Sequence, residues 1–342
     1  MKGAASLFAS RGMTLAPALV AACYFTLEKI GLFRLAPAST REVFHSTPFL
    51  ALSVLLALNA VAMLVARSNE DSRIARVGRA LFHLSVVLLV AALWVSYLTR
   101  FEGKAIRMQR QAFNGFRGDY IPKSLYMGRF ARVPQVGVLM NDIVPFPTKD
   151  MGGLRKAEAA ISYAGKWTSG PIGGRLSSRW PLFTDWTLIT LSDFGYTVRF
   201  VIEDPWKRPI DADYVSMKLF PPGKEDFFKS YLLPFTFFLK LYPEHVEKGG
   251  QPATLSPYLK NPLFQLRITR NKDIVYNDTI RPTEHLRFEN LVLSLPETRM
   301  WVEMTFVRDL GLPVAAAGLL LMISGAALIT VGRMRKGKGR AR

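Results

Sequence analysis

The chain has 342 residues, of which 49% are hydrophobic and 21% charged, and its formal net charge is +19. Residues 100–309 hold 30 Lys/Arg and 22 Asp/Glu, a net charge of +8, so the other +11 surrounds hydrophobic segments. This distribution is typical of membrane topology signals, and it argues against nucleic-acid binding. The single cysteine, Cys23, excludes an internal disulfide, and the lack of CxxC and CxxCH motifs excludes a zinc ribbon and a covalent c-type haem.

The first hundred residues predict a membrane region with three transmembrane helices. The clearest lies between Arg79 and Arg100, where 20 residues carry no fixed charge. That length suits a helix crossing a hydrocarbon core of about 30 Å. No cleavable signal peptide is evident, and the first hydrophobic run is interpreted as a retained anchor. The three helices are expected at about 13–33, 48–66 and 80–99, within region 1–100.

A fourth transmembrane helix is predicted at 311–332, followed by a basic tail at 333–342. Gly318 and Gly325 fall near one face of this helix and favour close helix packing. Basic residues concentrate at the N-terminus, in the loop 67–79 and in the tail. Short basic loops stay in the cytoplasm, so both termini are expected there, in a multi-pass protein of the bacterial inner membrane.

Residues 101–309 are expected to form a large, mostly-β domain facing the periplasm. Segment 186–202 is rich in β-branched and aromatic residues around an Asp-Phe-Gly turn, and 264–280 resembles two strands joined through Arg270–Asp273. Segment 286–307 alternates partly, and 150–164 is interpreted as a short helix. The predicted fold class is therefore an α+β membrane protein, with four transmembrane helices and a large extracytoplasmic β-rich domain between the third and fourth.

His83 is the leading candidate for a functional residue, because a histidine at membrane depth is costly to bury and imidazole is a common ligand of iron. The alternative is a histidine that hydrogen-bonds a neighbouring helix or reaches the surface. His245 and His285 lie beside acids, and an exposed surface position is expected for both. The GPIGGR stretch at 170–175 lacks the ending of a phosphate loop and predicts a turn.

The aromatic stretch 227–242, FFKSYLLPFTFFLKLY, is too short and too interrupted to cross a membrane. Core strands are one interpretation. The other is a surface that meets the bilayer or a partner protein.

Three segments resemble the ResB (also CcsB) family of cytochrome c biogenesis proteins: FHSTPFLALSVLLALNAVAMLVAR, FHLSVVLLVAALWVSYLTRFEGKAIRMQ and VRDLGLPVAAAGLLLMISG. DADYVSMKL at 211–219 is similar to a Tyr-x-Ser strand of the family. Two departures are Leu310, where the family has proline, and LSLPETRMWVEM, which replaces its Tyr-Gln-Ser segment. The positions that match the family's motifs are Phe49, Asn59, Arg67, His83, Gly103, Asp309 and Gly311.

This resemblance implies a subunit of a System II cytochrome c maturation complex, which helps to carry haem across the membrane for attachment to apocytochrome c. It implies that His83 ligates the iron of a non-covalent, transient haem b. It also implies a separate ResC/CcsA-type membrane partner with a Trp-rich loop, and no catalytic residue or enzyme activity in this chain alone. The alternatives are a membrane-anchored scaffold or assembly factor that handles no haem, and a small membrane redox protein, which would need a second haem ligand.

Overall fold

A computed structural model describes residues 47–65, 73–145, 157–166, 168–177, 180–218, 224–282 and 284–340. The protein is α+β, with strands making most of its regular structure. The described residues divide into two compact units. The helical unit holds the helices and the segment Met127–Arg132, and the strand unit holds Phe101–Tyr126 and Val133–Arg308.

The helical unit contains α4 (Thr47–Val65), α5 (Arg73–Thr99) and α6 (Gly311–Arg340). Among the described helices, α5 and the part of α6 up to Met334 are long and apolar enough to cross a membrane, whereas the apolar part of α4 is shorter. Helices are thus present at the second, third and fourth expected positions. The first, at 13–33, lies outside the described residues, so the four-span arrangement stays a prediction.

Two helix boundaries differ from expectation. Helix α5 begins at Arg73 rather than near residue 80, and α6 continues through the basic tail to Arg340. Hydropathy marks only the apolar part of a helix. Because Ala, Arg, Lys and Met are strong helix formers, the backbone hydrogen bonds continue beyond that part.

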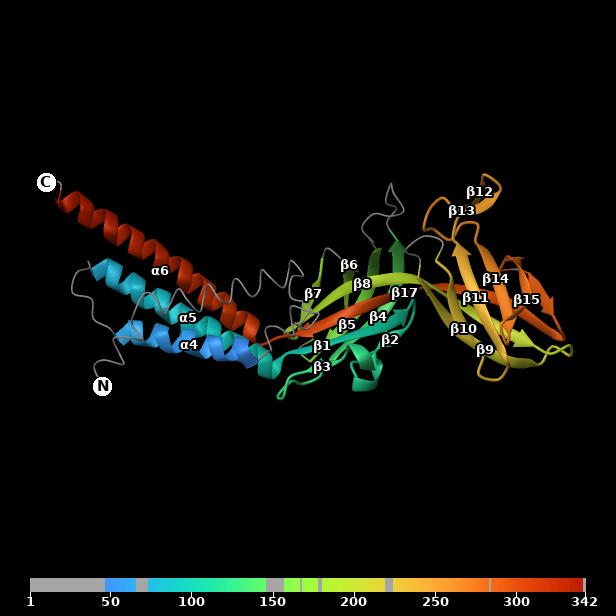
Figure 1. The fold of residues 1–342 in the computed structure, drawn as a ribbon, viewed down its shortest axis with the longest axis horizontal. Helices are drawn as coiled ribbons and strands as arrows, with labels where there is room; N and C mark the ends of the chain where they lie inside the picture. Colours follow the sequence, from blue (N-terminus) through green and yellow to red (C-terminus); the bar gives the residue numbers. More distant parts are fainter. Residues whose placement is uncertain are drawn as a thin grey trace. The chain divides into compact units, whose positions relative to one another are not determined.

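Helices α5 and α6 lie side by side (Figure 1). They contact each other through glycines. A Cβ added to Gly325 would lie 2.7 Å from both the Gly78 oxygen and the Phe82 nitrogen. A Cβ added to Gly318 would lie 3.0 Å from Cγ of Leu89. This close approach of two backbones confirms the prediction made from the spacing of Gly318 and Gly325. We call this contact the glycine seam.

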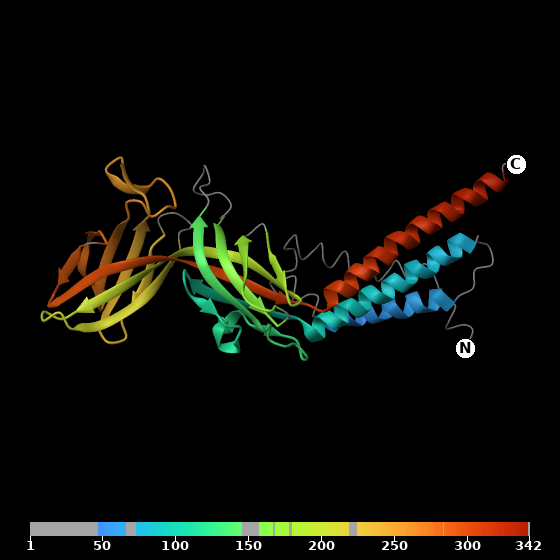
Figure 2. The same ribbon diagram turned by 180° about the vertical axis from the view of Figure 1, so that it is seen from behind.

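Two long antiparallel strands, β8 (Thr187–Glu203) and β17 (Leu291–Arg308), form the centre of the strand unit (Figures 1 and 2). They belong to a seven-stranded sheet of order β3-β1-β17-β8-β7, in which β16 also pairs with β17 and β9 with β8. The pairing shifts register between Ser294 and Glu297, where Pro296 lacks an amide hydrogen for the ladder.

The expected Asp-Phe-Gly turn at 193–195 is wrong, because β8 passes straight through it. Gly195 lies opposite Trp301 of β17, and a Cβ there would lie 2.8 Å from the indole ring and 2.2 Å from the Met217 oxygen. The indole Nε1 donates to the oxygens of Tyr196 and Met217, at 3.0 and 3.1 Å. The glycine therefore makes room for a buried tryptophan instead of turning the chain.

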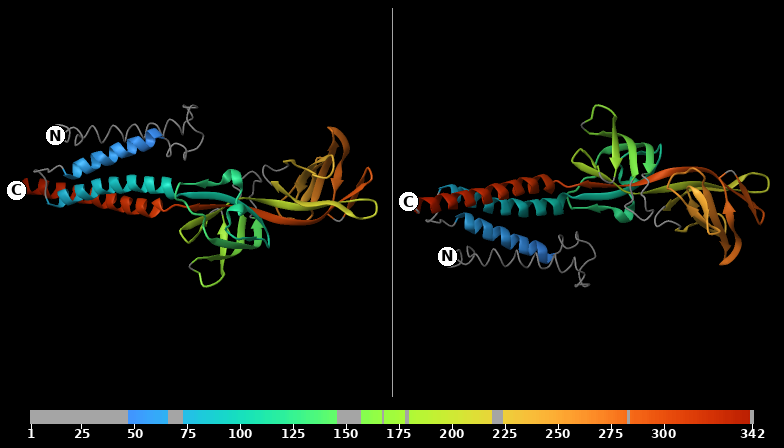
Figure 3. Two further views of the ribbon diagram at one scale, coloured as in Figure 1. Left: turned by 90° about the horizontal axis from the view of Figure 1, so that it is seen from below. Right: turned by 90° about the horizontal axis from the view of Figure 1, so that it is seen from above.

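The remaining strands complete the seven-stranded sheet and form two four-stranded sheets, β2-β4-β5-β6 and β10-β11-β14-β15, and one two-stranded sheet, β12-β13 (Figure 3). Two short 3-10 helices, η1 (Arg117–Asp119) and η2 (Pro122–Ser124), follow β2. The bounds are β1 Phe101–Met108, β2 Ala112–Phe113, β3 Tyr126–Met127, β4 Val136–Pro145, β5 Ala157–Gly165, β6 Ile172–Ser177, β7 Leu182–Thr184, β9 Pro209–Lys218, β10 Asp226–Lys229, β11 Phe235–Tyr242, β12 His245–Lys248, β13 Gln251–Thr254, β14 Leu263–Arg270, β15 Asp273–Ile280 and β16 His285–Phe288.

The short helix expected at 150–164 is wrong where the structure describes that segment. Residues from Ala157 onward form β5, in which Ala157, Ala159 and Ile161 are buried and alternate with more exposed neighbours. This two-residue period suits a strand with one buried face, although alanine and glutamate favour helices locally. The two strands expected in 264–280 are confirmed as β14 and β15.

The aromatic stretch 227–242 forms strands, as one of its two interpretations held. Strand β11 buries alternate side chains, Phe235, Phe237, Leu239 and Leu241, while β10 pairs with its outer edge. Tyr231, in the connection between them, is 97% exposed. The β11 part of the stretch therefore contributes alternate side chains to the core, and the prediction that the stretch meets a membrane or partner now concerns only its exposed side chains.

Candidate functional site

His83 lies on α5, ten residues after the first residue of the helix. At 1.5 Å per residue this is about 15 Å along the helix axis. The imidazole is half-buried, and its ring meets the Phe82 ring edge-on with 5.9 Å between centroids. The site residue thus belongs to a helix that is long and apolar enough to cross a membrane.

The imidazole is directed away from the glycine seam. Phe82 lies at the seam, because its backbone nitrogen approaches Gly325. The next residue of an α-helix is rotated by about 100°, so His83 is on another face of α5. We infer from this rotation that the contact between α5 and α6 does not use the imidazole.

A single imidazole can supply one ligand to haem iron. Within the described ranges, no cluster of three or more His, Cys, Asp or Glu side chains is arranged to hold a metal ion. His285 on β16 is exposed, as expected, and His245 on β12 is half-buried beside the Tyr242 ring, at 6.4 Å. Of these three histidines, His83 is on a helix long and apolar enough to cross a membrane, and it would supply a single nitrogen ligand to a bound iron.

Two of the positions that match the family's motifs, Asn59 and Arg67, belong to α4 and to the segment after it. Asn59 is completely buried within the helix, at 0% exposure. A buried amide in an apolar helix has to be hydrogen-bonded, which favours a role in helix packing. Arg67 lies outside the described residues.

Asp309 and Gly311 come together where α6 begins. The buried Asp309 carboxylate accepts hydrogen bonds from the Gly311 amide at 2.9 Å and from the Ser96 hydroxyl at 2.7 Å. Its Oδ2 also lies 3.4 Å from Nη1 of Arg100. A Cβ on Gly311 would lie 2.4 Å from the Ala92 oxygen, so glycine lets the start of α6 touch α5. Asp309 thus caps α6 and ties it to the end of α5.

Gly103 serves packing in the strand unit. A Cβ there would lie 2.8 Å from the Tyr120 ring. That ring meets Phe101, Phe113 and Phe306 edge-on, with centroid distances of 5.1, 5.1 and 5.5 Å. Gly103 therefore makes room for a buried aromatic cluster.

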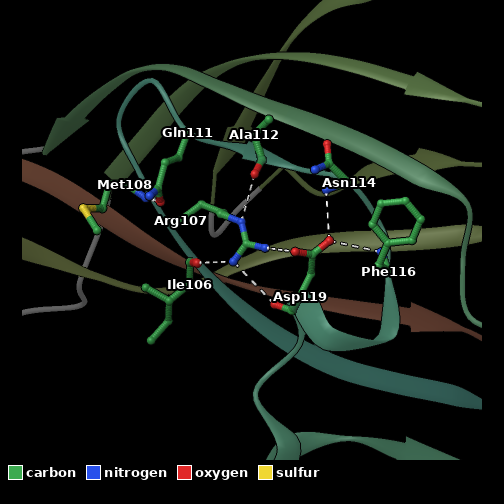
Figure 4. Close-up of polar contacts among 8 residues, drawn as sticks. All are labelled: Ile106, Arg107, Met108, Gln111, Ala112, Asn114, Phe116 and Asp119. Atoms are coloured by element: carbon green, nitrogen blue, oxygen red, sulfur yellow. Dashed lines mark hydrogen bonds and ion pairs between the residues drawn. The ribbon is translucent and has the colours of Figure 1, made fainter.

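A polar cluster around Arg107 and Asp119 was not predicted (Figure 4). The Arg107 guanidinium donates to the Asp119 carboxylate at 2.6 Å. It also donates to main-chain oxygens of Ile106, Ala112 and Asp119, while the other carboxylate oxygen accepts the amides of Asn114 and Phe116. The pair holds the connection between β1 and η1 in one conformation. No sequence pattern signals it, because Arg107 on β1 and Asp119 on η1 are twelve residues apart and the chain between them is largely irregular.

The exposed part of the aromatic stretch borders a groove of ≈ 910 Å³. Its walls include Phe227 and Phe238, and its rim carries Lys229, Arg267 and Lys272, without an acidic residue among the lining side chains. The Arg267 guanidinium carbon lies 4.1 Å from the centroid of the Phe238 ring. Because Arg267 also pairs with Glu225 at 2.7 Å, the aromatic walls and the two lysines are the groups that would suit an anionic, partly apolar ligand or peptide.

No model of a known protein family matches the chain, and no curated protein matches it in sequence. Among solved structures, a chain described as "Cytochrome c Heme Lyase CcmF" is similar at 13% identity with a TM-score of 0.30. The match covers 94% of this chain and 35% of that chain. A likeness at this level carries no argument about function, and a function for this chain has to be inferred from its own residues.

Proposed function

We propose that this chain is a ResB-like subunit of a System II cytochrome c maturation complex in the bacterial inner membrane. It has four transmembrane helices and both termini in the cytoplasm, and its strand unit faces the periplasm. It works with a ResC/CcsA-type partner, which contributes the Trp-rich loop, and it helps to present haem b to apocytochrome c.

The position of His83 is the observation that carries this proposal. The imidazole lies on a helix able to cross a membrane and on a face that the glycine seam does not use. Haem iron, when bound, supplies a Lewis-acidic centre that accepts the lone pair of a neutral imidazole nitrogen. His83 provides that nitrogen, and the surrounding apolar helix excludes water that would compete for the same position.

Two of the other motif residues, Asp309 and Gly311, position the helix that carries His83. The glycine seam fixes α6 against α5 along their length, and Asp309 fixes the two helices where α6 begins. Asp309 and Gly311 are therefore positioning residues, and neither is a catalytic residue. The attachment chemistry belongs to the partner complex.

The second candidate function is a membrane-anchored scaffold or assembly factor that handles no haem. The glycine seam and the Asp309 contacts favour it equally, because they join α5 and α6 into a helical anchor whether or not haem is bound. The two functions differ only in what His83 does.

The deciding experiment compares wild-type protein with His83→Ala, each purified with its partner from membranes. The variant is expected to insert and accumulate normally, since the half-buried imidazole is outside the seam, but to carry less haem and support less cytochrome c maturation. Haem is measured by absorption spectroscopy, and maturation by the yield of covalent c-type cytochrome. Added imidazole is expected to restore part of the haem, because it fits the space left by the side chain.

His285→Ala is the matched control, because it removes an exposed imidazole from the strand unit. It should leave haem content and spectrum unchanged. Equal haem with identical spectra in wild type and His83→Ala would establish that His83 is not a ligand and would favour the scaffold function.

A further inference from the structure

The segment Met127–Arg132 is bound to the C-terminal end of α5. The Gly128 amide donates to the Arg100 oxygen at 2.9 Å, and the Phe130 amide donates to the Leu98 oxygen at 2.8 Å. Carbonyls at the end of a helix have no partner within the helix. The segment satisfies the Leu98 oxygen in the last turn of α5 and the Arg100 oxygen just after it, so it is held to the helix end by backbone contacts.

Gly128 makes this attachment possible. A Cβ at this position would lie 2.6 Å from the Leu98 oxygen and 2.7 Å from the Tyr97 oxygen. A larger residue would therefore push the segment away from α5. The Ala131 amide then donates to the Gly128 oxygen at 2.9 Å, which closes a turn over residues 128–131.

The turn presents one aromatic and two basic side chains. Phe130 is 63% exposed, and Arg129 and Arg132 are exposed on either side of it. The Arg129 guanidinium carbon lies 5.8 Å from the centroid of the Phe130 ring. Neither arginine forms an ion pair with an acid in the described part of the chain.

Two more aromatic side chains mark the same end of α5. Trp94 and Tyr97 meet edge-on, with 6.2 Å between ring centroids. Tryptophan and tyrosine concentrate at membrane–water interfaces, where one part of the ring system is apolar and the other is hydrated. Their position, within the last two turns of an apolar helix, indicates that the bilayer surface lies at this level.

We propose that residues 129–132 form a loop that binds anionic phospholipid headgroups where α5 leaves the bilayer. The two guanidinium groups bind lipid phosphates, for which their planar donor geometry is suited. Phe130 inserts between the headgroups and the first acyl carbons, at the level of Trp94 and Tyr97. The proposal requires α5 to cross the membrane, but it does not depend on haem binding by His83.

A lipid surface fits these observations better than a soluble anion. The turn is anchored by two backbone hydrogen bonds at the end of an apolar helix, and an exposed phenylalanine lies between its arginines. Free phosphate would engage the arginines but would leave the ring in water. A bilayer satisfies both parts at once.

The first test measures the depth of residue 130 in the full-length protein reconstituted in lipid bilayers. A nitroxide is attached to Phe130→Cys in a Cys23→Ser background, and its accessibility to oxygen and to a water-soluble nickel complex is measured. Oxygen access is expected to exceed nickel access. Tyr231→Cys, at a fully exposed position of the strand unit, is the control and should show the reverse.

Nickel access at residue 130 equal to that at residue 231 would place the loop in water and overturn the proposal. Shielding of residue 130 from both reagents would indicate a protein interface and would overturn it too.

The second test measures lipid preference. Wild-type protein in phosphatidylcholine bilayers is expected to immobilise spin-labelled phosphatidylglycerol more than spin-labelled phosphatidylcholine. The relative association constant should fall by roughly fivefold for each arginine removed in Arg129→Gln/Arg132→Gln. The control variant, Arg117→Gln/Arg287→Gln, removes two exposed arginines of the strand unit and should keep the preference. A preference unchanged in the first variant would overturn the proposal.

Discussion

The Asp309 carboxylate lies 3.4 Å from Nη1 of Arg100, although 209 residues separate them in sequence. The whole strand unit is inserted between these two positions. The ion pair therefore joins the chain's exit from α5 to its return into α6. Only 3% of the Asp309 side chain is exposed, against 30% of Arg100, so the carboxylate depends on its donors while the guanidinium still reaches solvent.

We expect Arg100 and Asp309 to be energetically coupled. In a double-mutant cycle of Arg100→Gln and Asp309→Asn, the coupling free energy should exceed about 1 kcal/mol, because a nearly buried carboxylate loses its charged partner. The measurement is denaturant unfolding of the full-length chain in detergent. Arg267 and Glu225 form a more exposed pair at 2.7 Å and serve as the control cycle, with about 0.2–1 kcal/mol expected. Equal coupling in the two cycles would contradict the role given to Asp309.

The glycine seam should not tolerate a methyl group at Gly78. An added Cβ would lie 2.7 Å from the Ile329 nitrogen and 2.8 Å from the Gly325 oxygen, and backbone atoms cannot move away cheaply. Gly78→Ala is expected to cost about 1–3 kcal/mol of stability, seen as a lower Tm of the full-length protein.

Gly173→Ala is the control for this substitution. No atom lies within 4 Å of a Cβ at Gly173, so alanine there should be neutral or slightly stabilising. If Gly78→Ala melted at the wild-type temperature, the close approach of α5 and α6 would be disproved.

Sequence patterns predicted the parts of the fold that depend on short-range periodicity. The seven-residue spacing of Gly318 and Gly325 indicated a packing face, and the turn at Arg270–Asp273 indicated two strands. The prediction of an Asp-Phe-Gly turn was wrong because Gly195 makes room for the side chain of Trp301, which is 106 residues away on a paired strand. Such cross-strand requirements leave no local signal.

In the candidate site, too, sequence patterns identified residues with a local signal and missed contacts that depend on distant parts of the chain. His83 was found because a histidine is rare within an apolar segment, and Asp309 was found through the resemblance at the start of α6. The partners Ser96 and Arg100 were not assigned to Asp309, because contacts between helices depend on their rotation and separation. Arg107 and Asp119 were missed because their contact depends on the path of an irregular connection.

Membrane topology is open to a direct check. Reporter fusions after Arg340 and within 67–79 are expected to read cytoplasmic, because short basic segments are retained on that side. Fusions near Lys166 and Lys248, both in the strand unit, are expected to read periplasmic. Paired activities of a periplasmic and a cytoplasmic reporter at each position provide the control for expression. A cytoplasmic result at Lys166 would refute the four-span arrangement.

Tyr196 and Tyr120 form a matched pair of buried phenols in the strand unit. The Tyr196 hydroxyl donates to the Pro257 oxygen at 2.7 Å, whereas the Tyr120 hydroxyl is buried without a hydrogen-bond partner among the described residues. Tyr196→Phe should cost about 1–3 kcal/mol, because it leaves a buried carbonyl unsatisfied. Tyr120→Phe removes a desolvated hydroxyl that gains nothing, so its stability should equal or exceed that of wild type. Equal destabilisation by both variants would show that the Tyr120 hydroxyl has a partner.

The same pair predicts how the stability of the strand unit depends on alkaline pH. Burial raises the pKa of both tyrosines above the ordinary value of about 10, and the nearby Asp119 carboxylate adds to the effect on the pKa of Tyr120. In the unfolded chain both phenols ionise near pH 10, whereas in the folded chain they stay protonated. Their contribution to folding is therefore complete below pH 10 and declines as the pH rises above it. Denaturant unfolding at pH 8 and pH 11 should show a smaller loss of stability in either phenylalanine variant than in wild type. If wild type and both variants lost the same stability between pH 8 and pH 11, the two phenols would have the same pKa in the folded protein as in the unfolded chain.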